Sequence, residues 1–257
     1  MKKINVLLIT VLTLTVFSFI SCTKDDSESS ATGTLPSEIL FDKNKEWDLQ
    51  GFFLKFTYDD NNRIIKHEYG YSGTSAEYAV FDYTYNSSGE LTSISYKYYD
   101  EDGERTSNTN YTYSGNFVTA ISEDDDENKK YELQDGKIFK EYSCDPFLNL
   151  YLENRTFSYD SEGNITKILY SGSSSDIISY GNKKGIFSGV NMPNWLMLNS
   201  VFSELDFIFH TVNNPVTIQS DDYSCSWEYL AYNRNDYPTK AKIHGLYEVE
   251  IKYIDAK

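Results

Sequence analysis

The feature that most constrains the fold of this chain is a short phrase that recurs along it. The phrase is an aromatic residue, a polar residue and a tyrosine, then a turn rich in Asp, Asn, Ser and Gly, and then an alternating strand. Two clear copies read FTYDDNNRI at residues 56–64 and FSYDSEGNI at residues 157–165. Internal repetition means that one small structural unit is used many times, so the unit decides the fold.

Further, partly degenerate copies occupy residues 83–91, 111–117, 131–138 and 228–238. In the first five copies the third residue falls at positions 58, 85, 113, 133 and 159, spaced by about one hairpin plus a connection. Asn, Asp and Gly accept positive φ or bond to their own backbone in tight turns, and alternation with a period of two flanks each turn. Each copy therefore predicts a β-hairpin with one aromatic face and one small, polar face.

Composition supports strands over helices. Aromatic residues make up 16% of the chain, with 23 Tyr against 5 Pro and 14 Gly, and aromatic and β-branched residues favour strands. The formal net charge is -16, which disfavours nucleic acid and anionic membrane surfaces as partners. The sequence therefore predicts an all-β body that binds no nucleic acid.

The copies resemble the tyrosine-aspartate (YD) repeats of bacterial surface proteins, and more closely the degenerate YD-like hairpins of Bacteroidetes-type surface lipoproteins. SYGNKKGIF at residues 179–187 resembles the strand that ends such a repeat run, with Gly185 and Ile186 where Asn and Pro are expected. DYPTK at residues 236–240 resembles the closing turn, with Asp236 where Gly is usual.

This resemblance covers residues 49–254. It implies an all-β fold, an antiparallel meander of repeated hairpins that forms a rolled, porin-like sheet or open barrel, in a family without an established biochemical activity.

One passage has helical rather than strand periodicity. Apolar residues recur at helical spacing after Pro193, a favoured helix-start position, and they are Trp195, Leu198, Val201, Phe202, Leu205, Ile208 and Phe209. This spacing predicts one amphipathic helix at about 194–209. The helix either caps or plugs the rolled sheet and buries its Trp there, or it binds a partner.

The N-terminus has the features of an export signal. Two Lys precede an apolar stretch and a small residue, which predicts a signal peptide at residues 1–21; a retained membrane helix is the alternative. FISC at residues 19–22 resembles a lipobox, with Phe19 where Leu is usual, so Cys22 is the expected lipid-bearing residue. The lipid would then anchor the chain to a membrane.

The residues after Cys22 predict where the anchored chain is sent. Lys24, Asp25 and Asp26 resemble the acidic export signal that directs Bacteroidetes-type lipoproteins to the outer face of the outer membrane, and a solvated linker is compatible with the same residues. We therefore expect a lipidated, flexible linker at residues 22–36 and a YD-like repeat β domain at residues 37–257.

The sequence predicts no catalytic, cofactor or metal residues. The three His have no second ligand at metal spacing, and no Gly-x-Ser-x-Gly motif occurs. Acidic loops at residues 100–104 and 123–127 could bind Ca²⁺ or be solvated hairpin loops. Cys144 and Cys225 could pair in an oxidising compartment or be buried singly.

Tyrosine clusters are the candidate ligand contacts. They are Tyr69, Tyr71, Tyr96, Tyr98 and Tyr99. Alternation places Tyr96 and Tyr98 on one face of a strand and Tyr99 on the other. Exposed rings can stack on an extracellular glycan or contact a peptide, whereas buried rings would pack across strands.

The function that these features predict is a non-enzymatic binding or structural lipoprotein of the outer membrane, facing outside the cell. The alternative is an extracellular hydrolase acting on glycans. Convergent carboxylates in a deep pocket, one of them with a raised pKa, would favour the hydrolase.

Overall fold

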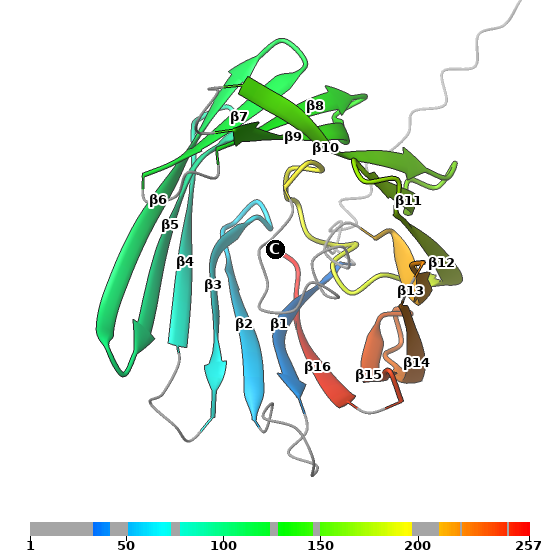
Figure 1. The fold of residues 1–257 in the computed structure, drawn as a ribbon. Helices are drawn as coiled ribbons and strands as arrows, with labels where there is room; N and C mark the ends of the chain where they lie inside the picture. Colours follow the sequence, from blue (N-terminus) through cyan, green and yellow to red (C-terminus); the bar gives the residue numbers. More distant parts are fainter. Residues whose placement is uncertain are drawn as a thin grey trace, which may run out of the picture. The chain divides into compact units, whose positions relative to one another are not determined.

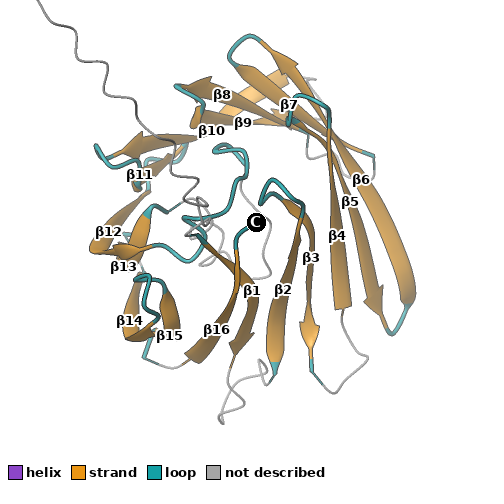
Figure 2. Ribbon diagram, turned by 180° about the vertical axis from the view of Figure 1, so that it is seen from behind, coloured by secondary structure: helices purple, strands orange, loops and turns teal. Residues whose placement is uncertain are grey.

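The fold is a sheet of sixteen strands (Figures 1 and 2). The computed structural model describes residues 33–41, 51–72, 78–123, 128–145, 150–196, 211–221, 223–245 and 247–257. The chain divides into the units Met1–Ser30 and Ala31–Lys257, and all described residues belong to the second.

The strands, in chain order, have the following bounds. The first eight are β1 (Thr34–Phe41), β2 (Phe52–Tyr58), β3 (Ile64–Tyr71), β4 (Tyr78–Tyr85), β5 (Leu91–Asp100), β6 (Gly103–Ser114), β7 (Phe117–Ser122) and β8 (Lys129–Gln134). The second eight are β9 (Lys137–Asp145), β10 (Leu150–Tyr159), β11 (Ile165–Tyr170), β12 (Ser175–Lys184), β13 (Asn213–Gln219), β14 (Ser224–Tyr232), β15 (Pro238–Ile243) and β16 (Tyr247–Asp255).

The sheet closes on itself. Each strand pairs antiparallel with its neighbours in sequence, and β1 pairs with β16 in a register that places Ile39 opposite Ile251 and Phe41 opposite Val249. The predicted all-β antiparallel meander is thus confirmed, but the rolled sheet or open barrel is corrected to a closed barrel. The closing strand β1 contains no copy of the repeated phrase, and it begins at Thr34, within the segment assigned to the linker.

The repeated turns share one geometry. In the first copy, Oδ1 of Asp59 accepts hydrogen bonds from the N–H groups of Asn61 and Arg63, both at 2.9 Å, and Asn62 has φ 60°. The same arrangement pairs Asn86 with Gly89, Asp160 with Gly163, and Asn233 with Asp236. The fourth turn residue is therefore Gly, Asn or Asp because these residues best tolerate positive φ.

A tyrosine in the later half of the even-numbered strands ties each hairpin together. The Tyr58 hydroxyl donates to the Pro36 carbonyl at 2.6 Å, and the Tyr85 hydroxyl donates to the Ile64 carbonyl at 2.9 Å. The same bond joins Tyr113 to Leu91, Tyr159 to Ile138, Tyr180 to Ile165, Tyr229 to Pro215 and Tyr253 to Pro238. We call these the tyrosine–carbonyl bonds.

The tyrosine–carbonyl bonds occur in seven of the eight consecutive strand pairs; in the pair β7–β8 the equivalent residue is Leu133, which has no hydroxyl. Burial raises the pKa of Tyr58, Tyr85 and Tyr113, that of Tyr113 to about 12. These hydroxyls therefore stay protonated and can donate.

Aromatic and aliphatic side chains fill the interior. Phe52, Leu54 and Phe56 alternate inward on β2 and are buried. Residues 185–196, which follow β12 and which we call the inner segment, lie inside the ring of strands in both ribbon views (Figures 1 and 2). Phe187 of this segment contacts Phe56 with ring centroids 5.0 Å apart.

Trp195 of the inner segment is buried, at 4% exposure, with its ring centroid 5.2 Å from that of Tyr111 and 5.5 Å from that of Tyr131. The inner segment also approaches β1 so closely that only glycine fits at position 189, because a Cβ there would lie 2.7 Å from the Thr34 carbonyl oxygen. The inner segment is therefore packed against the barrel wall from several sides.

The predicted helix at about 194–209 is not supported. Residues 194–196 form a turn in which the Leu196 N–H donates to the Pro193 carbonyl at 3.0 Å, and residues 197–209 lie outside the described part. Among the described residues, no helix is long and apolar enough to cross a membrane.

The outer face of the barrel is polar and charged. Across the closure, Glu38 on β1 lies 2.8 Å from Lys252 on β16 and 3.6 Å from Lys55 on β2. On β3, Lys66 and Glu68 pair at 2.8 Å. Single exposed apolar residues are interspersed, among them Ile121, Leu169 and Ile177. A membrane-spanning barrel needs the reverse pattern, an apolar band facing lipid.

One histidine is part of the aromatic interior. His67 stacks on Phe81 with ring centroids 4.1 Å apart, and its Nδ1 lies 2.7 Å from the Tyr83 hydroxyl. Burial lowers the pKa of His67 to about 3, against a smaller opposing effect of the Glu68 carboxylate. The imidazole is therefore neutral in the folded barrel at neutral pH.

We expect Tyr58→Phe to lower the free energy of unfolding by about 1–3 kcal/mol, because the buried Pro36 carbonyl loses its donor. Denaturant unfolding measures the change. Tyr99→Phe is the matched control, since Tyr99 lies on the outer face opposite Tyr78, and it should change stability by less than about 0.5 kcal/mol. Equal effects would show that the tyrosine–carbonyl bond contributes nothing specific.

We expect stability to fall with acid because of His67. The unfolded imidazole takes up a proton below about pH 6.5, whereas the folded one does so only near pH 3, so stability is full above pH 6.5 and is lost as the pH falls towards 3, by about 1.4 kcal/mol per pH unit. Denaturant unfolding between pH 6.5 and 5 measures the slope. His67→Gln should flatten it; an unchanged slope contradicts the assignment.

Candidate functional site

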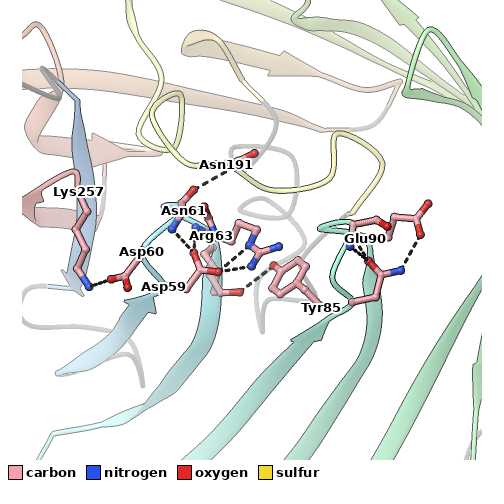
Figure 3. Close-up of polar contacts among 11 residues, drawn as sticks. Asp59, Asp60, Asn61, Arg63, Tyr85, Glu90, Asn191 and Lys257 are labelled. Atoms are coloured by element: carbon pink, nitrogen blue, oxygen red, sulfur yellow. Dashed lines mark hydrogen bonds and ion pairs between the residues drawn. The ribbon is translucent and has the colours of Figure 1, made fainter. Parts of the chain in front are cut away.

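The two ends of the barrel differ. At one end, the closed end, lie the repeated turns, Gly33 and the C-terminus; the other end, the open end, carries the connections β3–β4 and β5–β6. Figure 3 shows how the closed end is tied together. The Asn191 side chain of the inner segment donates to the Asn61 carbonyl at 3.1 Å, and Lys257 pairs with Asp60 at 2.7 Å.

A second set of contacts in Figure 3 joins neighbouring turns at the closed end. Arg63 pairs with Asp59 at 2.6 Å, and its guanidinium carbon lies 4.5 Å from the Tyr85 ring centroid. Asp59 and Asp60 are therefore paired with the cations Arg63 and Lys257, and Glu90 accepts from the Asn86 amide at 2.8 Å, so these contacts hold the turns in place.

Four of the five predicted tyrosines face the interior. The Phe52 ring centroid lies 5.9 Å from that of Tyr69 and 5.4 Å from that of Tyr71. Tyr96 lies 4.7 Å from Phe81 and 6.2 Å from Tyr98, again between ring centroids.

Tyr99 lies on the outer face, where it faces Tyr78 with ring centroids 5.9 Å apart. Strand alternation thus separates Tyr99 from Tyr96 and Tyr98, and the structure does not bring all five rings together.

Some inward-facing residues near the open end remain exposed, and we call them the open-end wall. They are Tyr96 and Tyr98 on β5, Arg105 on β6, and Leu150 and Leu152 on β10. Tyr96 and Tyr98 are partly exposed, Leu150 is 55% and Leu152 53% exposed, and the Arg105 side chain is 64% exposed. The wall combines aromatic faces, an apolar patch and a cation.

The register between neighbouring strands determines which residues belong to the open-end wall. Arg105 lies opposite Tyr98 across the β5–β6 hairpin. Leu152 lies opposite Ser143, which shares its face of β9 with the buried Glu141.

The sequence analysis did not identify Arg105, Leu150 or Leu152 as candidate binding residues. Arg105 could have been found by counting back from the two-residue turn after Asp100, whereas nothing local in the sequence places Leu150 and Leu152.

The predicted calcium loop at residues 100–104 holds a cation of the chain itself. Arg105 lies 2.7 Å from the Asp100 carboxylate and 3.7 Å from that of Asp102. Residues 124–127 of the other acidic loop lie outside the described part. Within the described ranges, no three His, Cys, Asp or Glu side chains are grouped so that they could hold a metal ion.

A buried polar network lies on the inner wall of β9–β12. Glu141, only 1% exposed, accepts from Arg155 Nε at 3.0 Å and Nη2 at 2.5 Å, and from the Asn154 amide at 3.0 Å. The Tyr170 hydroxyl donates to Asp176 at 2.7 Å. Both carboxylate oxygens of Glu141 thus accept from Arg155, so this carboxylate holds the guanidinium in place.

The two remaining cysteines lie on opposite faces. Cys225 faces inward on β14 and is fully buried, whereas Cys144 faces outward on β9. Neither forms a disulfide, because side chains on opposite faces of different strands cannot reach each other.

Among the described residues, two cavities lie away from the five predicted tyrosines. One of about 420 Å³ lies beside Leu40, Phe41 and Ser72, where Lys240 and Glu248 pair with each other at 2.8 Å. Another, of about 380 Å³, lies beside Asp160 and Tyr180. Neither contains any of the five predicted tyrosines.

Comparisons with known proteins identify no family for this chain. The chain matches no family model and no curated protein. Several solved structures resemble it weakly, among them two porin-like proteins. A porin-like protein from Bacteroides uniformis is 15% identical, with a TM-score of 0.41 over 88% of this chain and 100% of that chain. A porin-like protein from Bacteroides vulgatus is 12% identical, with a TM-score of 0.39 over 86% and 99%. The barrel assignment therefore rests on the strand pairing itself.

Proposed function

We propose that the chain is a lipid-anchored β-barrel of the outer membrane that binds an extracellular glycan at its open-end wall without turning it over. The observation that carries the proposal is the pair of partly exposed rings, Tyr96 and Tyr98, beside the exposed Arg105. Ring faces stack on the apolar faces of sugars, and guanidinium and carboxylate groups bond to hydroxyls.

The size of the wall suits an extended ligand. Neighbouring strands are about 4.8 Å apart, so β6 and β10, four strands apart in the barrel order, are separated by about 19 Å along the sheet. A ligand that contacts both Arg105 and Leu152 must therefore span several sugar units.

The polar outer face supports attachment through a lipid. Each Lys or Arg placed at the bilayer midplane on the wall of a barrel costs about 2–4 kcal/mol, and Lys55, Lys66 and Lys252 all lie on the outer face. Several acyl chains on Cys22 would hold the chain stably without immersing this surface. Lys24, Asp25 and Asp26 would then direct the anchored chain to the cell surface.

The path of the chain supports an orientation with the open end away from the membrane. Gly33 lies at the closed end, where its carbonyl accepts from the Ala256 N–H at 3.0 Å. Cys22 precedes Gly33 by eleven residues, which reach at most about 40 Å. The open-end wall would thus face the cell exterior.

The rival function, glycan hydrolysis, is less well supported. A glycosidase needs one carboxyl that is protonated at the working pH. Glu141, the buried carboxylate on the inner wall, accepts hydrogen bonds from Arg155 at both oxygens, so its oxygens are engaged with the guanidinium and are not presented to a substrate.

The anchor is tested with Cys22→Ala. We expect this variant to lose metabolic fatty-acid labelling and to appear as an uncleaved or soluble precursor, because only a thiol can take the lipid. Cys144→Ala, which alters another cysteine of the chain, should stay labelled and membrane-bound. A Cys22→Ala protein that keeps both label and membrane association would refute the anchor.

Glycan binding is tested with two adjacent tyrosines. On a glycan array, with the membrane-extracted chain in detergent, Tyr98→Ala should weaken binding about tenfold or more because a stacking face is lost. Tyr99→Ala, on the outer face, should leave binding unchanged. Thermal melts establish that both variants fold. Equal loss from both substitutions would contradict the site, and turnover of a bound glycan would favour the hydrolase.

A further inference from the structure

The β5–β6 hairpin extends beyond its neighbour β7. Strand β6 pairs with β5 from Gly103 to Asn110, but with β7 only from Thr109 to Ser114. One further hydrogen bond extends this pairing past the end of β7, because the Glu123 N–H donates to the Asn108 carbonyl at 3.0 Å. Beyond that point, the side of β6 that faces away from β5 has no adjacent strand in the part of the chain that the structure describes.

The backbone groups on this edge can be assigned. In an antiparallel strand the N–H and C=O of one residue point to the same side, and the side alternates along the strand. The Asn108 carbonyl points away from β5, to the side on which β7 pairs with β6. The N–H and C=O groups of Thr106 and Glu104 therefore point to that side too. These residues form what we call the free edge.

The charge around the free edge has one dominant sign. Five carboxylates belong to the residues that form or border it: Asp100, Glu101, Asp102, Glu104 and Glu123. The cations beside it are Arg105, which pairs with Asp100 at 2.7 Å, and Lys97, which lies opposite Thr106 on β5, so carboxylates outnumber cations at this edge. A ligand strand with positive side chains is therefore complementary to this edge.

We propose that the free edge binds an extended, basic peptide segment as an added β-strand. The peptide backbone pairs with the N–H and C=O groups of Glu104 and Thr106, which is the mode of recognition that an unpaired strand edge supports. Its positive side chains meet the surrounding carboxylates. This surface is distinct from the open-end wall, because it presents backbone groups at the edge of β6 rather than side chains on its inner face.

The test removes one backbone donor. Thr106→Pro deletes the N–H that points away from β5, so the β5–β6 ladder keeps its bonds, whereas Thr106→Val also loses the hydroxyl but keeps the N–H. Fluorescence anisotropy with the labelled octapeptide (Lys-Val)4 should show at least tenfold weaker binding for Thr106→Pro and unchanged binding for Thr106→Val, on the full chain in detergent. Equal binding by both variants overturns the proposal, as does the absence of binding to the unsubstituted chain.

Two further measurements make the result independent of the fold of the proline variant. Hydrogen exchange on the unsubstituted chain should show the Thr106 and Glu104 amides slowed by (Lys-Val)4 and unaffected by (Glu-Val)4; exchange unchanged by the basic peptide overturns the proposal. Tyr98→Ala should keep peptide binding. If it loses that binding, the peptide occupies the open-end wall, and the edge assignment is wrong.

Discussion

The tyrosine–carbonyl bond is the interaction on which the rest of this barrel depends. The hydroxyl of Tyr58, Tyr85 or Tyr159 crosses to a carbonyl at the start of the preceding strand, where the ladder has only just begun. In these copies the next residue, Asp or Asn, bonds the turn that starts the following hairpin. Two adjacent side chains thus tie one hairpin together and begin the next, and repetition carries this arrangement around the barrel.

Those tyrosines also explain why the interior is aromatic and the exterior polar. The rings of these tyrosines lie on the inner face with the other buried aromatic residues, and alternation then leaves many outer positions to Lys, Glu, Thr and Ser. The inner segment adds Phe187 and Trp195 to the same aromatic layer. The result is a barrel with an aromatic inner face and an outer wall that carries charged side chains.

The groups that bond outside the regular hairpins lie at the two ends of the barrel, where the repeat stops. At the closed end the turns, the inner segment and the C-terminus bond one another, as Asn191 and Lys257 show. At the open end β6 runs past β7, so backbone groups on its edge remain available, and inner-face rings of β5 are partly exposed there. Side-chain recognition and strand addition are separate there, because the two faces and the edge of a strand point in different directions.

The hairpins, their turns and the faces of the strands could be predicted from the amino-acid sequence, since these depend on residues within a few positions of each other. The turn of Asp59 to Arg63 and the separation of Tyr99 from Tyr96 and Tyr98 follow from local spacing alone. Tertiary structure decided the closure by β1, the carbonyl partner of each tyrosine, the pairing of Glu141 with Arg155 and the place of Leu152 on the open-end wall. These contacts join residues many positions apart in the sequence. Which residues meet depends on the register between strands, and the loops that connect those strands contain no sequence pattern that sets this register.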